Sequence, residues 1–174
     1  RRNPKTAERS LDLLRWGLVP HWAEGEKVAY TTINAKAEPI ASTRAFRDAW
    51  RKGRRCIIPL DAFYEWKQLP GGRKQPYAVS RVDGRLLAVA GLWESKVLPG
   101  GAILRTFTII TTTANALLVP LHARMPVILG EVDIPRWLGE RGTPDDDCAD
   151  LLRPCPPAWL KLTPVDPRMS DVRH

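Results

Sequence analysis

The chain has 174 residues, 44% of them hydrophobic and 26% charged, and these proportions exclude a predominantly disordered protein. Lysine and arginine outnumber aspartate and glutamate by 27 to 19, so the formal net charge is +8. This charge favours a polyanionic partner such as nucleic acid, the alternative being a merely solubilising surface charge. No apolar run approaches the ~20 residues that a membrane-spanning helix requires.

Cysteine usage and the first residues narrow the class further. The three cysteines, Cys56, Cys148 and Cys155, are odd in number and form no CxxC pair. This pattern fits a reducing compartment and predicts a cytoplasmic protein without disulfides or a structural metal. The sequence also has no Gly-rich phosphate loop, so we expect no cofactor. The chain opens with RRNP, which is neither a signal peptide nor an initiator methionine, so we expect it to begin inside a longer reading frame.

Abundant proline and short apolar runs favour many short strands over long helices. In chain order, the first half is predicted to contain a strand at 11–19, an extended piece at 31–35, one helix, and strands at 55–59 and 63–67. The helix is indicated by Phe46, Ala49 and Trp50, which recur with helical spacing. Ser42 or Thr43 can cap its start, and Gly53 ends it.

The second half continues with turns at 70–72 and 82–84 and strands at 77–81, 85–93 and 104–113. A helical turn at 114–118, a loop at 119–125, a strand at 126–129 and an amphipathic piece at 134–138 follow. Thr143, with Pro144 after it, is predicted to begin a second helix, and the last strand is expected at 159–165. This order predicts a β-rich α+β domain with a curled or barrel-like, mainly antiparallel sheet and flanking helices.

Glu65 is the carboxylate best placed for chemistry. In an extended strand Phe63, Glu65 and Lys67 share one side, and Tyr64 and Trp66 share the other. A carboxylate among aromatics is either on a solvated face or half-buried. Half-burial would raise its pKa and suit it to general acid–base catalysis.

Three other side chains could take part in a site. His122 lies in a loop directly before a predicted strand and could shuttle a proton, unless it is an incidental loop histidine. Asn34 could orient a substrate oxygen, or it could simply end a strand. Cys56, with His122 and Asn34, could compose a cysteine-peptidase set, but a cysteine within an apolar strand usually behaves as a small hydrophobic residue. The tryptophans are expected mostly in the core, although an exposed one would stack on unpaired bases.

Six ordered segments together resemble one protein family. They are RWGLVPHW at 15–22, INAKAE at 33–38, RCIIPLDAFYEWK at 55–67, AGLWE at 90–94, FTIITT at 107–112 and HARMPV at 122–127. Their order and spacing resemble the SOS-response-associated peptidase (SRAP) family, over about Leu11 to Val165. The resemblance implies a β-rich SRAP-like fold and the shielding of abasic sites in single-stranded DNA.

The resemblance also implies residue roles. In that family, removal of the initiator methionine exposes a cysteine, whose amine and thiol trap the abasic aldehyde as a thiazolidine. Asn34 matches the asparagine that holds the sugar hydroxyl or the amine. Glu65 matches the glutamate that moves protons during imine formation and methionine removal, and His122 matches the histidine that assists ring opening.

DNA contacts are implied in the same way. Lys36, Arg44 and Arg124 match basic residues that contact phosphates, while Trp22 and Thr111 fall where the family lines its DNA channel. Lys36 stands in place of the more usual arginine. The lysine keeps the positive charge but cannot make the bidentate contact of a guanidinium.

The Met-Cys-Gly-Arg start of the family is absent from this sequence. We therefore expect residues 1–174 to form a single SRAP-like domain that lacks its N-terminal segment, is monomeric, associates with the nucleoid and cannot crosslink DNA as it stands. Two alternatives remain: a non-catalytic module that binds single-stranded DNA, and a cysteine peptidase that uses Cys56.

Overall fold

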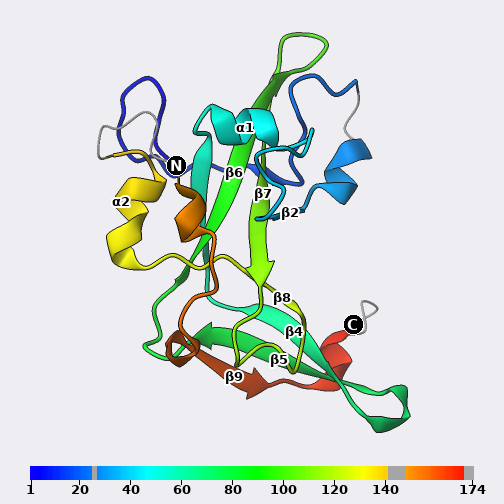
Figure 1. The fold of residues 1–174 in the computed structure, drawn as a ribbon. Helices are drawn as coiled ribbons and strands as arrows, with labels where there is room; N and C mark the ends of the chain where they lie inside the picture. Colours follow the sequence, from blue (N-terminus) through cyan, green and yellow to red (C-terminus); the bar gives the residue numbers. More distant parts are fainter. Residues whose placement is uncertain (25–26, 141–147, 171–174) are drawn as a thin grey trace.

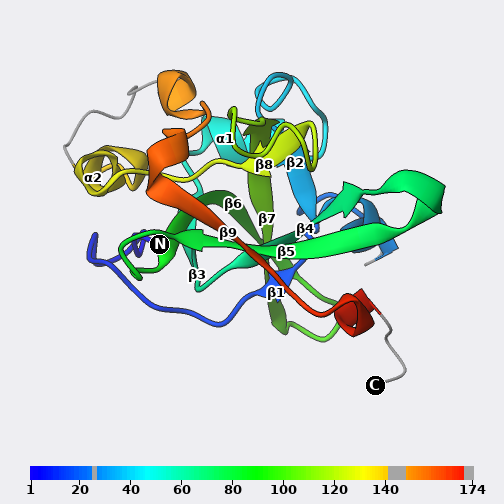
Figure 2. The same ribbon diagram turned by 90° about the horizontal axis from the view of Figure 1, so that it is seen from below.

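Two β-sheets form the framework of the molecule, in a computed structural model that describes residues 1–24, 27–140 and 148–170 (Figure 1). The larger sheet has six strands, and the smaller has three, in the order β4-β5-β9. The strands are β1 (Arg15–Trp16), β2 (Asn34–Lys36), β3 (Arg55–Leu60), β4 (Phe63–Gln68), β5 (Lys74–Arg81), β6 (Leu87–Val97), β7 (Ile103–Thr113), β8 (Arg124–Pro126) and β9 (Leu160–Pro164). Figure 2 shows the smaller sheet lying across the larger one.

Helices are short. The two α-helices are α1 (Arg47–Arg51) and α2 (Ile134–Trp137), and short 3-10 turns occur at Lys27–Thr31, Pro70–Gly72, Glu131–Asp133, Cys148–Leu151, Pro157–Trp159 and Pro167–Ser170. None of the helices in the described ranges is long and apolar enough to cross a membrane. The fold is therefore β-rich with a curled larger sheet, as the sequence predicts.

β7 is the strand around which the larger sheet is organised. It pairs antiparallel with β6 and β8 and parallel with β1 and β2. Its run of β-branched residues suits a strand that has neighbours on both edges. The register places Asn34 opposite Ile109, Lys36 opposite Thr111, and Arg124 opposite Thr113. One strand therefore brings together residues that are far apart in the sequence.

Gly91 allows its neighbours in the centre of the larger sheet to pack closely against the β6 backbone. It lies in β6, opposite Cys56 of β3 and Ile109 of β7. A Cβ at this position would collide with the Ile58 side chain and the Thr108 carbonyl oxygen. Only glycine leaves room for this approach.

Two apolar clusters make up most of the core. The first contains residues of the larger sheet together with residues from and around α1 and α2: Leu18, Phe46, Ala49, Leu92, Ile110 and Trp137 are among its members. Trp137 is fully buried and donates a hydrogen bond from Nε1 to the Cys56 carbonyl at 2.9 Å. The second cluster joins both sheets through side chains such as Val79, Val89, Met125 and Leu160. The second cluster therefore holds the two sheets against each other and sets the space between them.

The predicted strand at 11–19 is wrong except at β1. Leu11 and Leu13 are 94% and 102% exposed, because only residues 15 and 16 pair with β7. Gly17 ends the strand with a φ of 103°, and a Cβ there would strike the Ala29 backbone. A segment with alternating apolar residues therefore forms a β-strand only where a neighbouring strand can hydrogen-bond to it.

The predicted helix is shorter than expected. It begins at Arg47, and neither Ser42 nor Thr43 caps it, because both hydroxyls donate to the Pro39 carbonyl instead. The extended piece at 31–35 is also shifted, because Thr31 closes a 3-10 turn and the strand covers Asn34–Lys36.

The strand predicted at 126–129 is Arg124–Pro126, with Ile128 forming only an isolated bridge. The other predicted strands are confirmed, with bounds that differ by a few residues: Arg55–Leu60, Phe63–Gln68, Lys74–Arg81, Leu87–Val97, Ile103–Thr113 and Leu160–Pro164. The helix predicted from Thr143 begins outside the described residues.

Candidate active site

A cavity of about 670 Å³ opens between the larger sheet and β4. The structure brings the three predicted catalytic residues, Asn34, Glu65 and His122, to this one cavity. Lys36, Thr111 and Arg124 also line it, together with Trp16, Phe63, Tyr64, Trp66, Phe107 and several aliphatic side chains. The cavity therefore combines acid–base groups, positive charge and aromatic surface.

Glu65 and His122 approach each other from different elements. Glu65 lies on β4, an edge strand, and its side chain is only 21% exposed. His122 ends the turn before β8, where its backbone N–H donates to the Leu118 carbonyl at 3.0 Å. Asn115 anchors that turn because its side-chain oxygen accepts the Leu118 N–H at 3.2 Å. The His122 Nδ1 atom lies 3.9 Å from the Glu65 Oε1 atom.

Burial raises the pKa of the Glu65 carboxyl above its ordinary value. The charge of His122 and a hydrogen bond from the Trp66 backbone oppose this rise without cancelling it. Of the two environments that the sequence leaves open for Glu65, the structure therefore has the half-buried one. A carboxyl with a raised pKa can donate a proton closer to neutral pH than an ordinary glutamate.

The His122 ring is oriented by the next strand. Its Nδ1 atom accepts the Arg124 backbone N–H at 3.1 Å and lies 3.0 Å from the Arg124 carbonyl oxygen. A neutral ring can accept from the N–H, and a protonated ring can donate to the carbonyl or to Glu65. The N–H and the carbonyl of one residue thus hold the ring in place beside Glu65.

Arg124 is held by a carboxylate in this structure. Its Nη1 and Nη2 atoms donate to the two oxygens of Glu38 at 2.7 and 3.0 Å, and Nη2 also donates to the Thr111 carbonyl. Lys36 is exposed on β2 and lines the same cavity. The expected phosphate contacts of Lys36 and Arg124 remain predictions.

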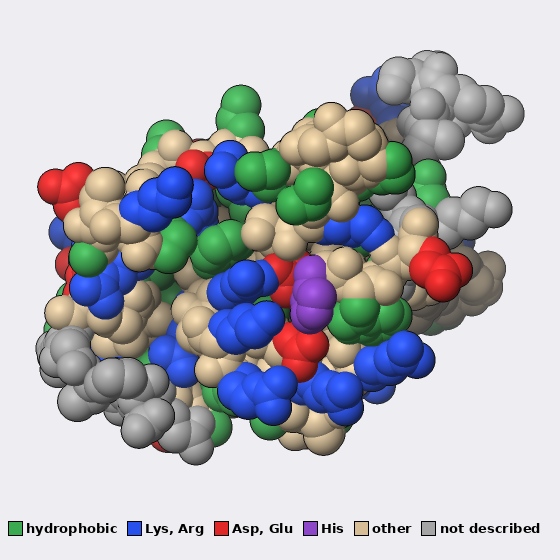
Figure 3. Space-filling model, turned by 90° about the horizontal axis from the view of Figure 1, so that it is seen from above, with side chains coloured by type: hydrophobic (Ala, Val, Ile, Leu, Met, Phe, Trp, Pro, Cys, Tyr) green, Lys and Arg blue, Asp and Glu red, His purple; other side chains and the backbone are tan. Residues whose placement is uncertain are grey.

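Trp22 and Arg44 do not line the cavity. They contact each other, with the Arg44 guanidinium carbon 4.3 Å from the centre of the Trp22 ring, and Trp22 is 40% exposed. Figure 3 shows Lys and Arg side chains gathered on one face of the molecule. Around α1, exposed basic side chains come from Arg44, Arg47, Arg51 and Lys52.

Sequence reasoning missed two exposed aromatic residues of the cavity. Trp16 is 51% exposed and Tyr64 is 44% exposed. The expectation that the tryptophans are mostly core is therefore wrong for Trp16, and also for Trp22. The Trp16 ring stacks on Phe107, at 6.5 Å between centroids and 10° between planes, and its Nε1–H donates to the Ile33 carbonyl at 2.8 Å. The proximity of Trp16 to Arg15 in the sequence is the only signal that could have suggested an exposed ring.

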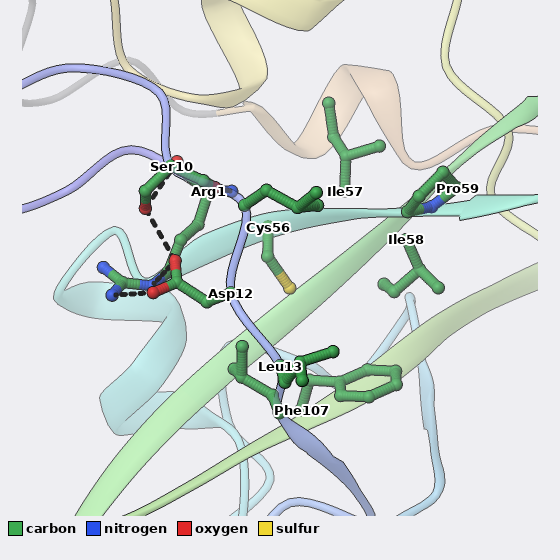
Figure 4. A pocket seen from close by; sticks show the side chains of 11 residues that line it. Arg1, Ser10, Asp12, Leu13, Cys56, Ile57, Ile58, Pro59 and Phe107 are labelled. Carbon is green, nitrogen blue, oxygen red and sulfur yellow. Dashed lines mark hydrogen bonds and ion pairs between the residues drawn. The ribbon is translucent and has the colours of Figure 1, made fainter.

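Cys56 lies in a different pocket, of about 170 Å³, beside Arg1, Ser10 and Asp12 (Figure 4). Its side chain is buried, and burial raises the pKa of its thiol to about 12. Burial likewise raises the pKa of Cys155 to about 11. Neither of these cysteines lines the cavity that holds Glu65, and both favour the thiol over the reactive thiolate. The peptidase set built on Cys56 is therefore not assembled.

Comparison with known proteins gives the family. The family model described as SOS response associated peptidase (SRAP) matches residues 1–172. This chain belongs to the SRAP family. Among its relatives is the abasic site processing protein YoqW of Bacillus subtilis, which is 44% identical over 144 residues, covering 83% of this chain and 64% of that protein. Another is the abasic site processing protein HMCES of Gallus gallus, which is 34% identical over 97% of this chain and 56% of its own length. The chain thus spans less than two thirds of these relatives.

Solved structures share the SRAP fold of this chain. A crystal structure of a protein from Bordetella bronchiseptica superposes with a TM-score of 0.81 at 33% identity, covering 95% of this chain and 82% of that one. One from Bacteroides thetaiotaomicron superposes with a TM-score of 0.82 at 28% identity, covering 90% and 70%.

Proposed function

We propose that the protein recognises abasic sites in single-stranded DNA and shields them by covalent capture, and that Asn34, Glu65 and His122 serve this reaction. The observation that carries the proposal is the 3.9 Å approach of His122 to the half-buried Glu65 within a basic, aromatic-lined cavity. The names of the relatives, which are abasic site processing proteins, support the substrate class.

The proposed nucleophile is an N-terminal cysteine that precedes Arg1 in the whole protein. The amine of such a cysteine attacks the aldehyde carbon of the ring-opened abasic sugar and forms a carbinolamine. Loss of water gives an imine, and addition of the thiol to the imine carbon closes a five-membered thiazolidine ring. Each cysteine of this chain has its own nitrogen in a peptide bond and cannot perform both steps.

Glu65 and His122 supply the proton transfers. Because burial raises the pKa of the Glu65 carboxyl, this group is a better proton donor near neutral pH than an ordinary glutamate, and it can protonate the carbinolamine hydroxyl as it leaves as water. His122 can assist opening of the sugar by moving a proton between the hydroxyl and the ring oxygen, and can do the same in reverse. The Asn34 amide can hold the sugar hydroxyl or the amine. The same pair could assist the self-processing step that exposes the cysteine.

Positively charged side chains attract the single-stranded DNA. Lys36, Arg44 and Arg124 are proposed to contact phosphates, with Thr111 beside Arg124 and Trp22 along the path of the DNA. We further propose that the protein acts as a monomer on DNA in the cytoplasm.

The test is a denaturing gel. The full-length protein is incubated with a single-stranded oligonucleotide that carries one abasic site, and a shifted band that resists heat and detergent is expected. A matched oligonucleotide with a reduced abasic site, which has no aldehyde, should give no such band. Absence of the band in both, with the protein folded, contradicts covalent capture.

One other function has an observation in its favour. Basic residues around α1 and exposed aromatics in the cavity would also suit a module that binds single strands without reacting. Reversible binding of single strands without the resistant band would favour this module.

A further inference from the structure

Glu38 lies among the cations that the proposed function assigns to DNA. It follows β2, and its two carboxylate oxygens receive hydrogen bonds from Arg124 at 2.7 and 3.0 Å. The hydrogen bond from Arg124 chiefly lowers the pKa of Glu38, and the charges of Arg124 and Lys36 lower it further. Glu38 is therefore an anion paired with Arg124, which lines the cavity, and it also feels the charge of Lys36.

The arrangement has the chemistry of a phosphate subsite. The guanidinium fork binds a carboxylate and a phosphate in the same bidentate way. The Arg124 Nη2 atom also donates to the Thr111 hydroxyl at 3.4 Å, so the hydroxyl lies directly beside the guanidinium. The Arg124 Nε atom is buried and has no hydrogen-bond partner within the described part of the chain. Glu38 and Thr111 thus leave one donor of this arginine unused.

The two partners differ in how easily they can move. The Glu38 side chain is 53% exposed, whereas that of Arg124 is 22% exposed and is also held by the Thr111 carbonyl. Glu38 can turn into water without disturbing the core, but Arg124 cannot. Since solvent-exposed ion pairs contribute little free energy, an incoming anion can replace Glu38 at small cost.

We propose that Glu38 occupies the position of a DNA phosphate in the free protein and must leave before a strand can bind there. The inference rests on the proposed binding of single-stranded DNA and adds a residue that opposes that binding. The competing carboxylate weakens the hold on every strand, damaged or not, and so shortens residence on undamaged DNA. Glu38 then sets affinity without contacting the reacting atoms.

The experiment measures binding of a fluorescent, undamaged single-stranded oligonucleotide to the full-length protein by anisotropy at several salt concentrations. Glu38→Gln should tighten binding by about two- to fivefold and steepen the salt dependence, by up to ~0.7 in log–log slope. Glu131→Gln is the matched control, because Glu131 also pairs with an arginine, but its partner Arg85 does not line the cavity, whereas Arg124 does. It should leave binding unchanged.

A second pair of variants tests the route of the effect. In an Arg124→Gln background, Glu38→Gln should give no further tightening, because the cation for which the carboxylate competes is gone. Unchanged or weaker binding by Glu38→Gln alone would overturn the inference and make Glu38 a support for Arg124. If the parent protein binds no single-stranded DNA, the proposed function fails as well. If the parent binds and only the tightening is missing, this inference alone fails.

Discussion

Trp16 is expected to be a base-stacking platform of the cavity. The residue is about half exposed in the cavity, and its ring is held by stacking on Phe107 and by the hydrogen bond to Ile33. Stacking of a base on an aromatic side chain contributes about 1–3 kcal/mol, so Trp16→Ala should weaken binding of single-stranded DNA by about 5- to 150-fold. Trp16→Phe keeps an aromatic face and should lose much less.

The same substitution has a separate effect on stability. Trp16 is 51% exposed, so burial of the remaining half removes roughly 100 Å² of apolar surface from water. At about 25 cal/mol per Å² this is ~2.5 kcal/mol, and the Nε1 hydrogen bond adds about 1 kcal/mol. The unfolded chain already buries part of its apolar surface, so such a sum is an upper value. Trp16→Ala should therefore lower the free energy of unfolding by about 2–3 kcal/mol.

Two assays separate these effects. Urea denaturation gives the free energy of unfolding, and anisotropy with a fluorescent single strand gives the affinity under conditions where each variant is folded. Tyr30→Ala is the control, because Tyr30 is 79% exposed but does not line the cavity. Folded Trp16→Ala that binds as tightly as the parent would refute the stacking role.

Four other variants, one of them a double substitution, test the remaining assignments. Because burial raises the pKa of Glu65 in the folded state, the unfolded chain ionises first as the pH rises, and stability falls through that interval. In urea denaturation series, the free energy of unfolding of Glu65→Gln should therefore exceed that of the parent near neutral pH and equal it at ~pH 3. The same variant should crosslink abasic DNA more slowly than the parent. Lys36→Ala with Arg44→Ala should weaken binding of single strands and flatten its salt dependence in anisotropy titrations, and an unchanged slope would remove both from the DNA path. Cys56→Ser should crosslink abasic DNA at the parental rate on denaturing gels, whereas loss of activity in a folded variant would revive the peptidase alternative. Gly91→Ala should lower the free energy of unfolding by about 1–3 kcal/mol or more, because the added Cβ overlaps its neighbours.

Local patterns predicted most of the strands. The β-branched run of β7 and the turn around Asp83 and Gly84 are short-range signals, and they lie where they were expected. The segment at 11–14 failed because strand formation also needs a partner edge. Those residues have the right alternation, but β7 offers pairing only to Arg15 and Trp16. Such pairing depends on the whole topology and is not encoded locally.

Strand alternation and loop position singled out Glu65 and His122 separately, and the motif resemblance gave them roles, but neither showed that the two side chains meet. Glu65 and His122 are 57 residues apart, and nothing between them indicates that β4 and the turn before β8 converge (122 − 65 = 57). The partnership of Glu38 with Arg124, separated by 86 residues, was equally invisible. Charge patterns in a sequence report only neighbours along the chain, so the pairing that neutralises a predicted phosphate contact requires the fold.

β7 explains why this site forms as a unit. Its residues Ile109, Thr111 and Thr113 lie opposite Asn34, Lys36 and Arg124, respectively. A shift of one residue in the register of β2 or β8 would turn these polar side chains to the other face of the sheet and away from the cavity. Glu65 is held by the other sheet, and the apolar cluster between the sheets therefore controls its distance to His122. The acid–base pair is thus a property of how the two sheets pack, and neither sheet could supply it alone.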